Sequence, residues 1–387
     1  MREKLAVLVG LCLLSAGLVP TQPPELAWVG VYGGEGDEIG YAVEAIPGGY
    51  AIVGYTDSFG GGHKDIYLLE LGPDGKKLWE GAFGGPDDEW GYDLKWTDDG
   101  YVIVGARRTS AGDKDIYLIK VDDKHKLRWQ RTYGGTGDDV GYAVEVTPDG
   151  GYLIAGYTYS TQGFFGDLYL IKTDGRGRLL WERTYGGEDD DRGYALRITP
   201  EGDYLVLGYA VKERGSWGKP MLDKDFYLVK TNAEGEVIWE RTYGGGGIDE
   251  GWALELTGDG YLLLGFTETD EGTSDLYLVK TDTEGNVEWI ETYGGTGDDR
   301  GYAIQRDDKG YIITGVTRPS DGDSDLYLLK ISPGGNLLWE ARYGEEDYDE
   351  YGHDVLVPSE GGYLAIGARQ YSSGISDLYV LLTEGRE

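Results

Sequence analysis

One phrase recurs seven times along this chain, and it constrains the fold more than any other feature. In one-letter code it reads W-x-x-x-Y-G-G, then an acidic pair, G-Y-A, G-G-Y-L-x-x-G-Y-T and D-x-Y-L. Seven tryptophans mark the repeats: Trp28, Trp79, Trp129, Trp181, Trp239, Trp289 and Trp339. Their spacings are 51, 50, 52, 58, 50 and 50 residues. A period near 50 residues, made of short β-type segments, is typical of a propeller with one repeat per blade.

Each repeat contains four segments with strand character. In the third repeat these are residues 142–146, 152–157, 167–172 and 179–185, separated by turn-forming sequences rich in Asp and Gly. Four antiparallel strands make one blade. We therefore predict an all-β, seven-bladed β-propeller, and we count the strands of each blade from the first (inner) to the fourth (outer).

The two ends of the chain each carry part of one repeat. Residues 26–32 form a fourth strand without the preceding three, and the last repeat stops after its third strand at residues 377–382. We predict that the N-terminal strand completes the last blade. This pairing closes the ring and covers a raw sheet edge.

Residues 1–20 precede the repeats and follow the pattern of a secretory signal peptide. Arg2 and Lys4 give a basic start, and an apolar run follows over residues 5–18. This run of about 14 residues is short for a membrane span, which needs about 20. An uncleaved anchor and lipidation at Cys12 are the alternatives. We predict a secreted or cell-surface protein in which residues 21–387 form one propeller domain.

Composition excludes several kinds of function. The net charge of -35 argues against a nucleic-acid partner, because phosphate binding needs a basic surface. Three His and one Cys make a zinc site improbable. No phosphate loop, dinucleotide fingerprint or G-x-S-x-G elbow is visible. Few Asn among many charged residues suggest a thermophilic source.

The repeat resembles a class of propellers in secreted and surface proteins of archaea and bacteria. The match runs from Asp167-Leu168-Tyr169 through Tyr185-Gly186-Gly187 to Gly193-Tyr194, and the resemblance covers residues 26–382. It implies the propeller fold and an exported location, but no activity. The closing strand is similar to that of WD-repeat propellers, which carry an Asp in the turn before the third strand. Here an Asp opens the third strand of every repeat: Asp65, Asp115, Asp167, Asp225, Asp275, Asp325 and Asp377. We expect these seven to have a structural role as acceptors for loop amides.

The loop between the fourth strand and the next first strand is acidic in every repeat. One position carries Glu38, Glu89, Asp139, Asp191, Asp249, Asp299 and Glu350. The preceding position carries Asp37, Asp88, Asp138, Asp190, Asp298 and Asp349. We predict a ring of carboxylates around the channel mouth. Because calcium prefers several carboxylate and carbonyl oxygens, the second set is a candidate calcium site, with hydrogen bonding to loop amides as the alternative. We expect no other cofactor.

Departures from the repeat point to a candidate catalytic pocket. The second inner-strand position is Ala in five repeats but Asp93 and Asp354 in two, and His353 replaces the usual Tyr beside Asp354. Strand alternation places Lys95 and Glu44, two residues further along their strands, on the same face as this position. We consider a polar pocket of these five residues, with mutual charge pairing around a tight centre as the alternative.

Aromatic residues in the loops offer a second kind of site. They are Trp90, Phe164, Phe165, Trp217 and Tyr351, and Trp217 lies in the long loop that causes the 58-residue spacing. Exposed aromatics beside carboxylates can stack on sugars or grip a peptide, and the alternative is that they cover the rim of their own blade.

Three functions remain open on the sequence alone. The first is a non-catalytic binding or scaffold module, a monomer that contacts a protein or glycan through this acidic, aromatic face. The second is a polysaccharide hydrolase or lyase with channel carboxylates as acid and base. The third is a calcium-stabilised structural ring.

Overall fold

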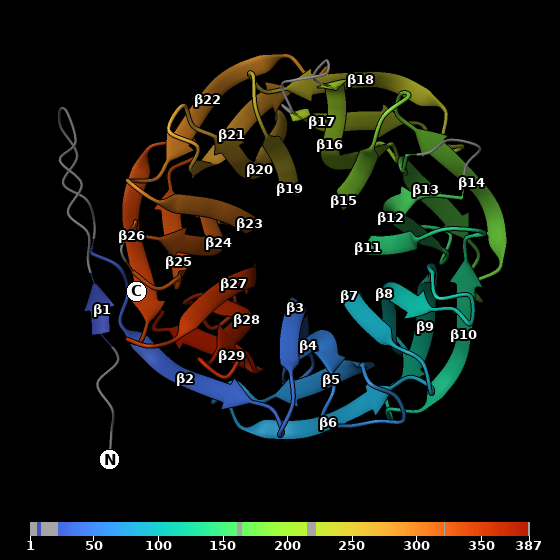
Figure 1. The fold of residues 1–387 in the computed structure, drawn as a ribbon, viewed down its shortest axis with the longest axis horizontal. Coiled ribbons are helices and arrows are strands. Elements are labelled where there is room, and N and C mark those ends of the chain that lie inside the picture. The colour runs from blue at the N-terminus through green and yellow to red at the C-terminus, as the bar shows by residue number, and fades with distance from the viewer. Residues whose placement is uncertain (1–5, 9–21, 161–164, 215–221, 321, 386–387) are drawn as a thin grey trace.

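A closed ring of seven antiparallel sheets surrounds one central axis, toward which the first strand of each blade lies and which we call the channel axis (Figure 1). The computed structural model describes residues 6–8, 22–160, 165–214, 222–320 and 322–385. In this part of the chain no helix is long and apolar enough to cross a membrane. The predicted seven-bladed β-propeller with four strands per blade is confirmed.

The first four blades follow one another along the chain. Blade 1 contains β3 (Glu38–Ile46), β4 (Gly49–Thr56), β5 (Asp65–Leu71) and β6 (Lys77–Phe83). Blade 2 contains β7 (Glu89–Thr97), β8 (Gly100–Arg108), β9 (Lys114–Asp122) and β10 (Leu127–Tyr133). Blade 3 contains β11 (Asp139–Val146), β12 (Tyr152–Thr158), β13 (Asp167–Thr173) and β14 (Leu179–Tyr185). Blade 4 contains β15 (Asp191–Ile198), β16 (Tyr204–Arg214), β17 (Leu222–Thr231) and β18 (Val237–Tyr243).

The last three blades include the point where the ring closes. Blade 5 contains β19 (Asp249–Leu256), β20 (Gly260–Glu268), β21 (Ser274–Asp282) and β22 (Val287–Tyr293). Blade 6 contains β23 (Asp298–Asp307), β24 (Gly310–Arg318), β25 (Asp325–Ile331) and β26 (Leu337–Gly344), with β1 (Ala6–Leu8) paired to β26. Blade 7 contains β27 (Asp349–Leu356), β28 (Leu364–Gln370), β29 (Ser376–Thr383) and β2 (Leu26–Tyr32).

The closure of the ring agrees with the sequence prediction. β2 pairs with β29 in antiparallel register, with Trp28 opposite Leu382 and Val31 opposite Tyr379 (Figure 1). The short β1 belongs to the segment predicted as a signal peptide. Removal of that segment would leave β26 as the outer edge of blade 6.

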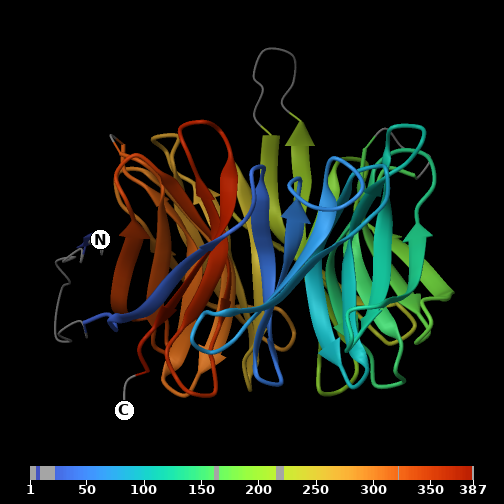
Figure 2. The same ribbon diagram turned by 90° about the horizontal axis from the view of Figure 1, so that it is seen from below.

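The hydrophobic core is divided among the interfaces between blades. Each of seven buried clusters combines residues of two neighbouring blades, as where Val43 and Ile52 of blade 1 pack with Ile366 and Val380 of blade 7. Seen from the side, the strands run between two faces on which the loops gather (Figure 2). One of these faces carries the acidic loops, and we call it the loop face.

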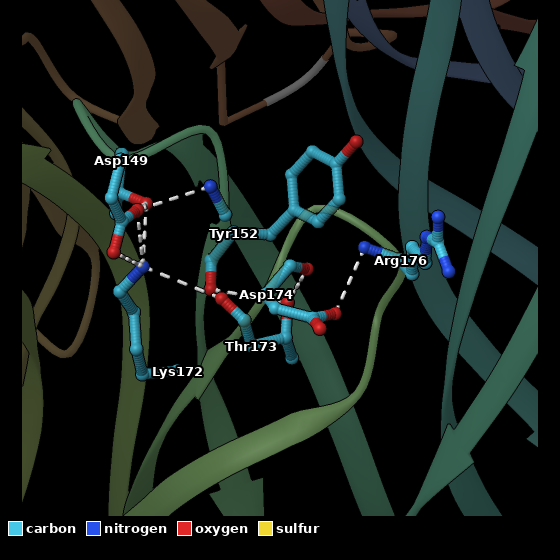
Figure 3. Close-up of polar contacts among 8 residues, drawn as sticks. Asp149, Tyr152, Lys172, Thr173, Asp174 and Arg176 are labelled. Carbon is cyan, nitrogen blue, oxygen red and sulfur yellow. Dashed lines mark hydrogen bonds and ion pairs between the residues drawn. The ribbon is translucent and has the colours of Figure 1, made fainter.

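A lysine that is buried in four blades and partly buried in blade 4 braces each of five blades near the opposite face. In blade 3, Lys172 Nζ donates to Thr147 Oγ1 at 2.6 Å and contacts Asp149 Oδ1 at 2.8 Å (Figure 3). The equivalent ion pairs are Lys120–Asp99, Lys230–Asp203, Lys280–Asp259 and Lys330–Asp307. A buried charge is tolerated only when it is paired, so these lysines fix the turn between the first two strands. The sequence reasoning missed this repeated clamp.

Candidate functional site

Seven aromatic side chains surround the channel just below the loop face. We call them the aromatic girdle: Tyr41, Tyr92, Tyr142, Tyr194, Trp252, Tyr302 and His353. Successive ring centroids lie between 4.2 Å (Tyr194–Trp252) and 6.2 Å (Tyr302–His353) apart, and the circuit closes between His353 and Tyr41 at 5.2 Å. Every member is partly exposed. The girdle therefore presents aromatic surface to the channel axis.

A β-bulge at the same place in every inner strand positions the girdle. In blade 1, Gly40 pairs with Gly54 and Ala42 with Val53, so Tyr41 is an extra residue between two paired ones. The same register shift occurs in the other six inner strands. Because a bulge re-aims the side chain that it carries, the aromatic residue turns toward the channel axis. Tyr41, Tyr92 and Tyr142 still pack against a buried cluster that includes Tyr55 and Tyr157. The sequence reasoning treated these strands as regular and missed the girdle.

Five basic side chains lie beside the girdle, each over an aromatic ring. We call them the cationic collar: Lys64, Lys114, Arg192, Lys224 and Arg300. Their distances to ring centroids are 3.9 Å (Tyr55), 4.9 Å (Trp90), 4.3 Å (Tyr157), 3.9 Å (Tyr209) and 4.5 Å (Phe266), respectively. Tyr55, Tyr157 and Tyr209 in turn pack 6.0–6.2 Å from girdle members. These five cations lie among carboxylates of the same loops, such as Asp190, Asp298 and Glu250.

Of the five predicted catalytic residues, His353 belongs to the girdle, and Glu44, Asp93, Lys95 and Asp354 lie close to one another below it. Lys95 Nζ is 3.5 Å from Asp93 Oδ1, as expected for residues on one face of a strand. Burial raises the pKa of Glu44 to about 7, and burial raises that of Asp354 to about 6, while Lys95 opposes both shifts. Further around the channel, Arg197 lies 3.6 Å from Glu145. From blade 1 to blade 4 the residues at this level, Glu44, Lys95, Glu145 and Arg197, therefore alternate in charge.

Three of these residues also bind the backbone of a neighbouring blade. Asp93 Oδ2 accepts a hydrogen bond from Val144 N, and Asp354 Oδ2 accepts one from Val43 N, both at 2.8 Å. His353 Nδ1 is 2.8 Å from the carbonyl oxygen of Gly40, and burial lowers its pKa. His353 and Asp354 thus join blade 7 to blade 1 at the seam of the ring. This contact gives a structural reason for departures that the sequence reasoning read as catalytic.

The predicted calcium ligands are distributed one per blade. Five of them accept a backbone hydrogen bond from the neighbouring blade, as Asp138 of blade 3 does from Lys114 N, which stands directly before Asp115 of blade 2. The donor–acceptor distances are 2.7–3.1 Å, and the five acceptors are Asp37, Asp138, Asp190, Asp298 and Asp349. Asp88 instead pairs with Arg108 Nε at 2.9 Å. In the described part of the chain no group of three or more His, Cys, Asp or Glu side chains could hold a metal ion.

The expected carboxylate ring around the mouth is wrong in one respect, because its inner members face the protein. Glu38, Glu89, Asp139, Asp191, Asp249, Asp299 and Glu350 are all buried. Six of them accept a hydrogen bond from the second glycine of the Y-G-G segment, as Asp139 does from Gly135 N at 2.9 Å. Buried loop amides need acceptors, and these side chains supply them.

The predicted loop aromatics have different surroundings. Trp90 is only 8% exposed, because Lys114 and Arg108 cover its ring, so it cannot be the open stacking surface that we expected. Tyr351 is partly exposed, with its ring 6.5 Å from that of His353. Phe165 is partly exposed. Phe164 and Trp217 lie outside the described residues.

Comparisons with known proteins support the fold alone. No protein-family profile matches the chain, and no curated protein sequence matches it. Among solved structures, it is similar to the Pan2 WD40 domain of Neurospora crassa, with 11% identity, 91% of this chain and 90% of that chain covered, and a TM-score of 0.55. It is also similar to a puromycin-hydrolyzing peptidase of Mycobacterium tuberculosis, with 13% identity, 90% of this chain and 52% of that chain covered, and a TM-score of 0.53. A third similar structure is that of a putative 6-phosphogluconolactonase of Bacteroides uniformis, with 13% identity, 83% of this chain and 93% of that chain covered, and a TM-score of 0.51. Neighbours with such different names share the propeller architecture with this chain.

Proposed function

We propose that this chain is an exported, non-catalytic binding or scaffold propeller that holds its ligand at the loop-face mouth of the channel. The observation that carries the proposal is the partly exposed aromatic girdle framed by the cationic collar. Aromatic side chains supply a large contact area at a small entropic cost, which suits a binding surface.

The chemistry below the girdle supports binding over catalysis. Both carboxylate oxygens of Asp93 and of Asp354 accept backbone hydrogen bonds. Groups that hold two blades together cannot move freely to transfer protons. The ligand we expect is a protein or glycan at the cell surface, met by a monomeric propeller that the N-terminal segment directs out of the cell.

A binding screen followed by one girdle variant tests this proposal. The screen measures binding and product formation on a glycan array and on a panel of purified cell-surface proteins. Trp252→Ala should weaken binding of any ligand found by at least tenfold, whereas Leu180→Ala, on the exposed outer edge of blade 3, should leave it unchanged. Equal binding by Trp252→Ala, once thermal melts show that it is folded, would place the ligand elsewhere.

A polysaccharide hydrolase or lyase is the second candidate, and one observation favours it. The pKa of Glu44, raised to about 7 by burial, would let this side chain act as a general acid near neutral pH. The test is whether the protein releases reducing ends from an acidic or neutral polysaccharide. An activity that Glu44→Gln abolishes, and that Glu288→Gln on the outer strand retains, would favour the enzyme. Absence of products from a polysaccharide that binds tightly would favour the binding module.

A further inference from the structure

The charges at the channel mouth suggest which ligand the proposed binding site takes. The five basic residues of the collar lie beside the girdle in a chain that carries 70 acidic and 35 basic residues. Two of them have acidic partners: Arg192 Nε is 3.2 Å from Asp190 Oδ2, and Lys224 Nζ is 2.5 Å from Glu250 Oε1. Within the described residues, Lys64, Lys114 and Arg300 form no ion pair with a carboxylate.

Arg300 connects this unpaired charge to the girdle. Its guanidinium lies over Phe266 and donates to Ser274 Oγ at 3.1 Å, and its charge opposes the rise in the pKa of the girdle member Tyr302 that burial causes. An unpaired, partly buried guanidinium favours a planar anion such as a carboxylate, which it can bind through two parallel hydrogen bonds. The acidic surface of the chain repels an anion, but at physiological salt this repulsion is screened beyond about 8 Å. Contacts at the mouth therefore decide whether an anion binds.

The girdle adds the chemistry of a sugar site. Five of its members are tyrosines, whose hydroxyls can both donate and accept hydrogen bonds. Trp252 Nε1 is buried and has no acceptor among the described residues. The aromatic faces can stack on the apolar faces of a pyranose ring. Neighbouring centroids lie 4.2–6.2 Å apart, so the girdle is a closed aromatic circuit against which one sugar ring at a chain end can stack.

We propose that the mouth binds the carboxylate-bearing sugar unit of an acidic glycan, with its ring against the aromatic girdle and its carboxylate at Arg300. This inference rests on the proposed function and names the class of its ligand. An acidic peptide is the competing occupant, and the experiment below separates the two.

Calorimetric titration at 0.15 M salt with a matched pair of probes tests the proposal. The probes are an oligogalacturonate and its methyl ester, which share sugar rings but differ in charge. The acid should bind at least tenfold more tightly than the ester. Arg300→Gln should remove this preference, Arg300→Lys should restore part of it, and Lys309→Gln, an exposed lysine in the turn between β23 and β24, should change nothing. Thermal melts verify that each variant is folded.

The outcomes separate this proposal from the proposed function. If acid and ester bind equally and Trp252→Ala weakens both, the mouth is a binding site but not one for acidic sugars. If poly-glutamate displaces the oligogalacturonate at lower concentration than free galacturonate does, the occupant is an acidic peptide. If neither saccharide binds, the acidic-glycan proposal is wrong, and the proposed function then depends on the panel of surface proteins.

Discussion

Two kinds of blade interface use the same acidic pair with different neighbours. Between blades 1 and 2, oxygens of Asp65 and Glu89 lie 1.8 and 2.4 Å from the point that a Cβ on Gly84 would occupy. Between blades 5 and 6, oxygens of Asp275 and Asp299 lie 2.2 and 3.0 Å from the same point on Gly294. Each pair thus brings two carboxylates into one small space, which only glycine leaves open.

The two kinds of interface differ in the residue of the second strand that pairs with the acidic residue at the start of the first strand. Arg107 lies opposite Glu89, with Nε 2.9 Å from Oε1, and Arg369 lies opposite Glu350 at 2.8 Å. At the interfaces between blades 2 and 3 and between blades 5 and 6, a threonine stands in that place and supplies no charge. Asp139 Oδ1 and Asp275 Oδ1 are buried without a hydrogen-bond partner among the described residues, as is Asp65 Oδ1 beside Glu89. Because two like charges so close cannot both ionise easily, we expect the arginine-free pairs to share a proton.

Loss of an arginine should have the largest effect on stability. Arg369→Met leaves Glu350 buried without its cation and removes packing on Tyr379, so the free energy of unfolding should fall by about 3 kcal/mol at pH 8. Urea unfolding measures the change. The loss should be smaller at pH 5, because Glu350 can then take up a proton.

Two controls distinguish this effect from general damage. Arg131→Met removes a partly exposed arginine that lies over Trp129 and forms no ion pair among the described residues, so it should cost far less. Adding Glu350→Leu to Arg369→Met should recover part of the lost stability, because an apolar pair replaces the stranded charge. A double variant as unstable as the single one would contradict a charge-based explanation.

Acidification should stabilise the wild-type propeller by the next largest amount. Burial raises the pKa of Asp191 to about 6, with Asp167 and Asp190 adding repulsion, and burial also raises the pKa of Asp115, Asp139 and Asp275. A carboxyl whose pKa is higher in the folded state binds its proton more tightly there. Its contribution is fully present below the unfolded value near 4 and is lost as pH rises through about 6.

Melting curves at pH 5 and pH 8 measure this effect. We expect a gain of about 2 kcal/mol at pH 5, which is a few degrees in melting temperature for a chain of this size. Below about pH 3 stability should fall again, because the lowered pKa of Asp149, about 2, reflects its hydrogen bond to Lys172. A melting temperature that rises steadily from pH 5 to pH 8 would exclude shared protons.

The contrast between the two interfaces also shows what the sequence could reveal. The period gave the blade count and the partial repeats gave the closure, because both depend on pattern alone. The acidic pairs join residues such as Asp65 and Glu89 from different blades, so only the three-dimensional arrangement brings them together. A signal was nonetheless present: Glu and Arg occur together in the second and seventh repeats, where most others have Asp and Thr. The girdle left no such signal, since G-Y-A reads the same in a regular strand and in a bulged one.

Neutralising one acid should have opposite effects at the two kinds of interface. Asp275→Asn removes a like-charge repulsion and supplies an amide donor for Asp299, so it should stabilise the fold by about 1 kcal/mol at pH 8. Glu89→Gln deprives Arg107 of its carboxylate and should be destabilising. Urea unfolding of both variants at pH 8 compares them directly. Two changes of the same sign would show that the arginine does not distinguish the interfaces.

Calcium should have the smallest effect, and it tests whether a proton or a metal ion neutralises the arginine-free pairs. A shared proton needs no metal, so calcium chloride or a chelator at pH 8 should shift the melting temperature by less than about 1 °C. A bound ion would instead stabilise the folded state in proportion to its occupancy. If calcium raises the melting temperature by several degrees and Asp275→Asn reduces that gain, the pairs hold a cation. The two kinds of interface would then be alike in charge, one neutralised by arginine and the other by metal.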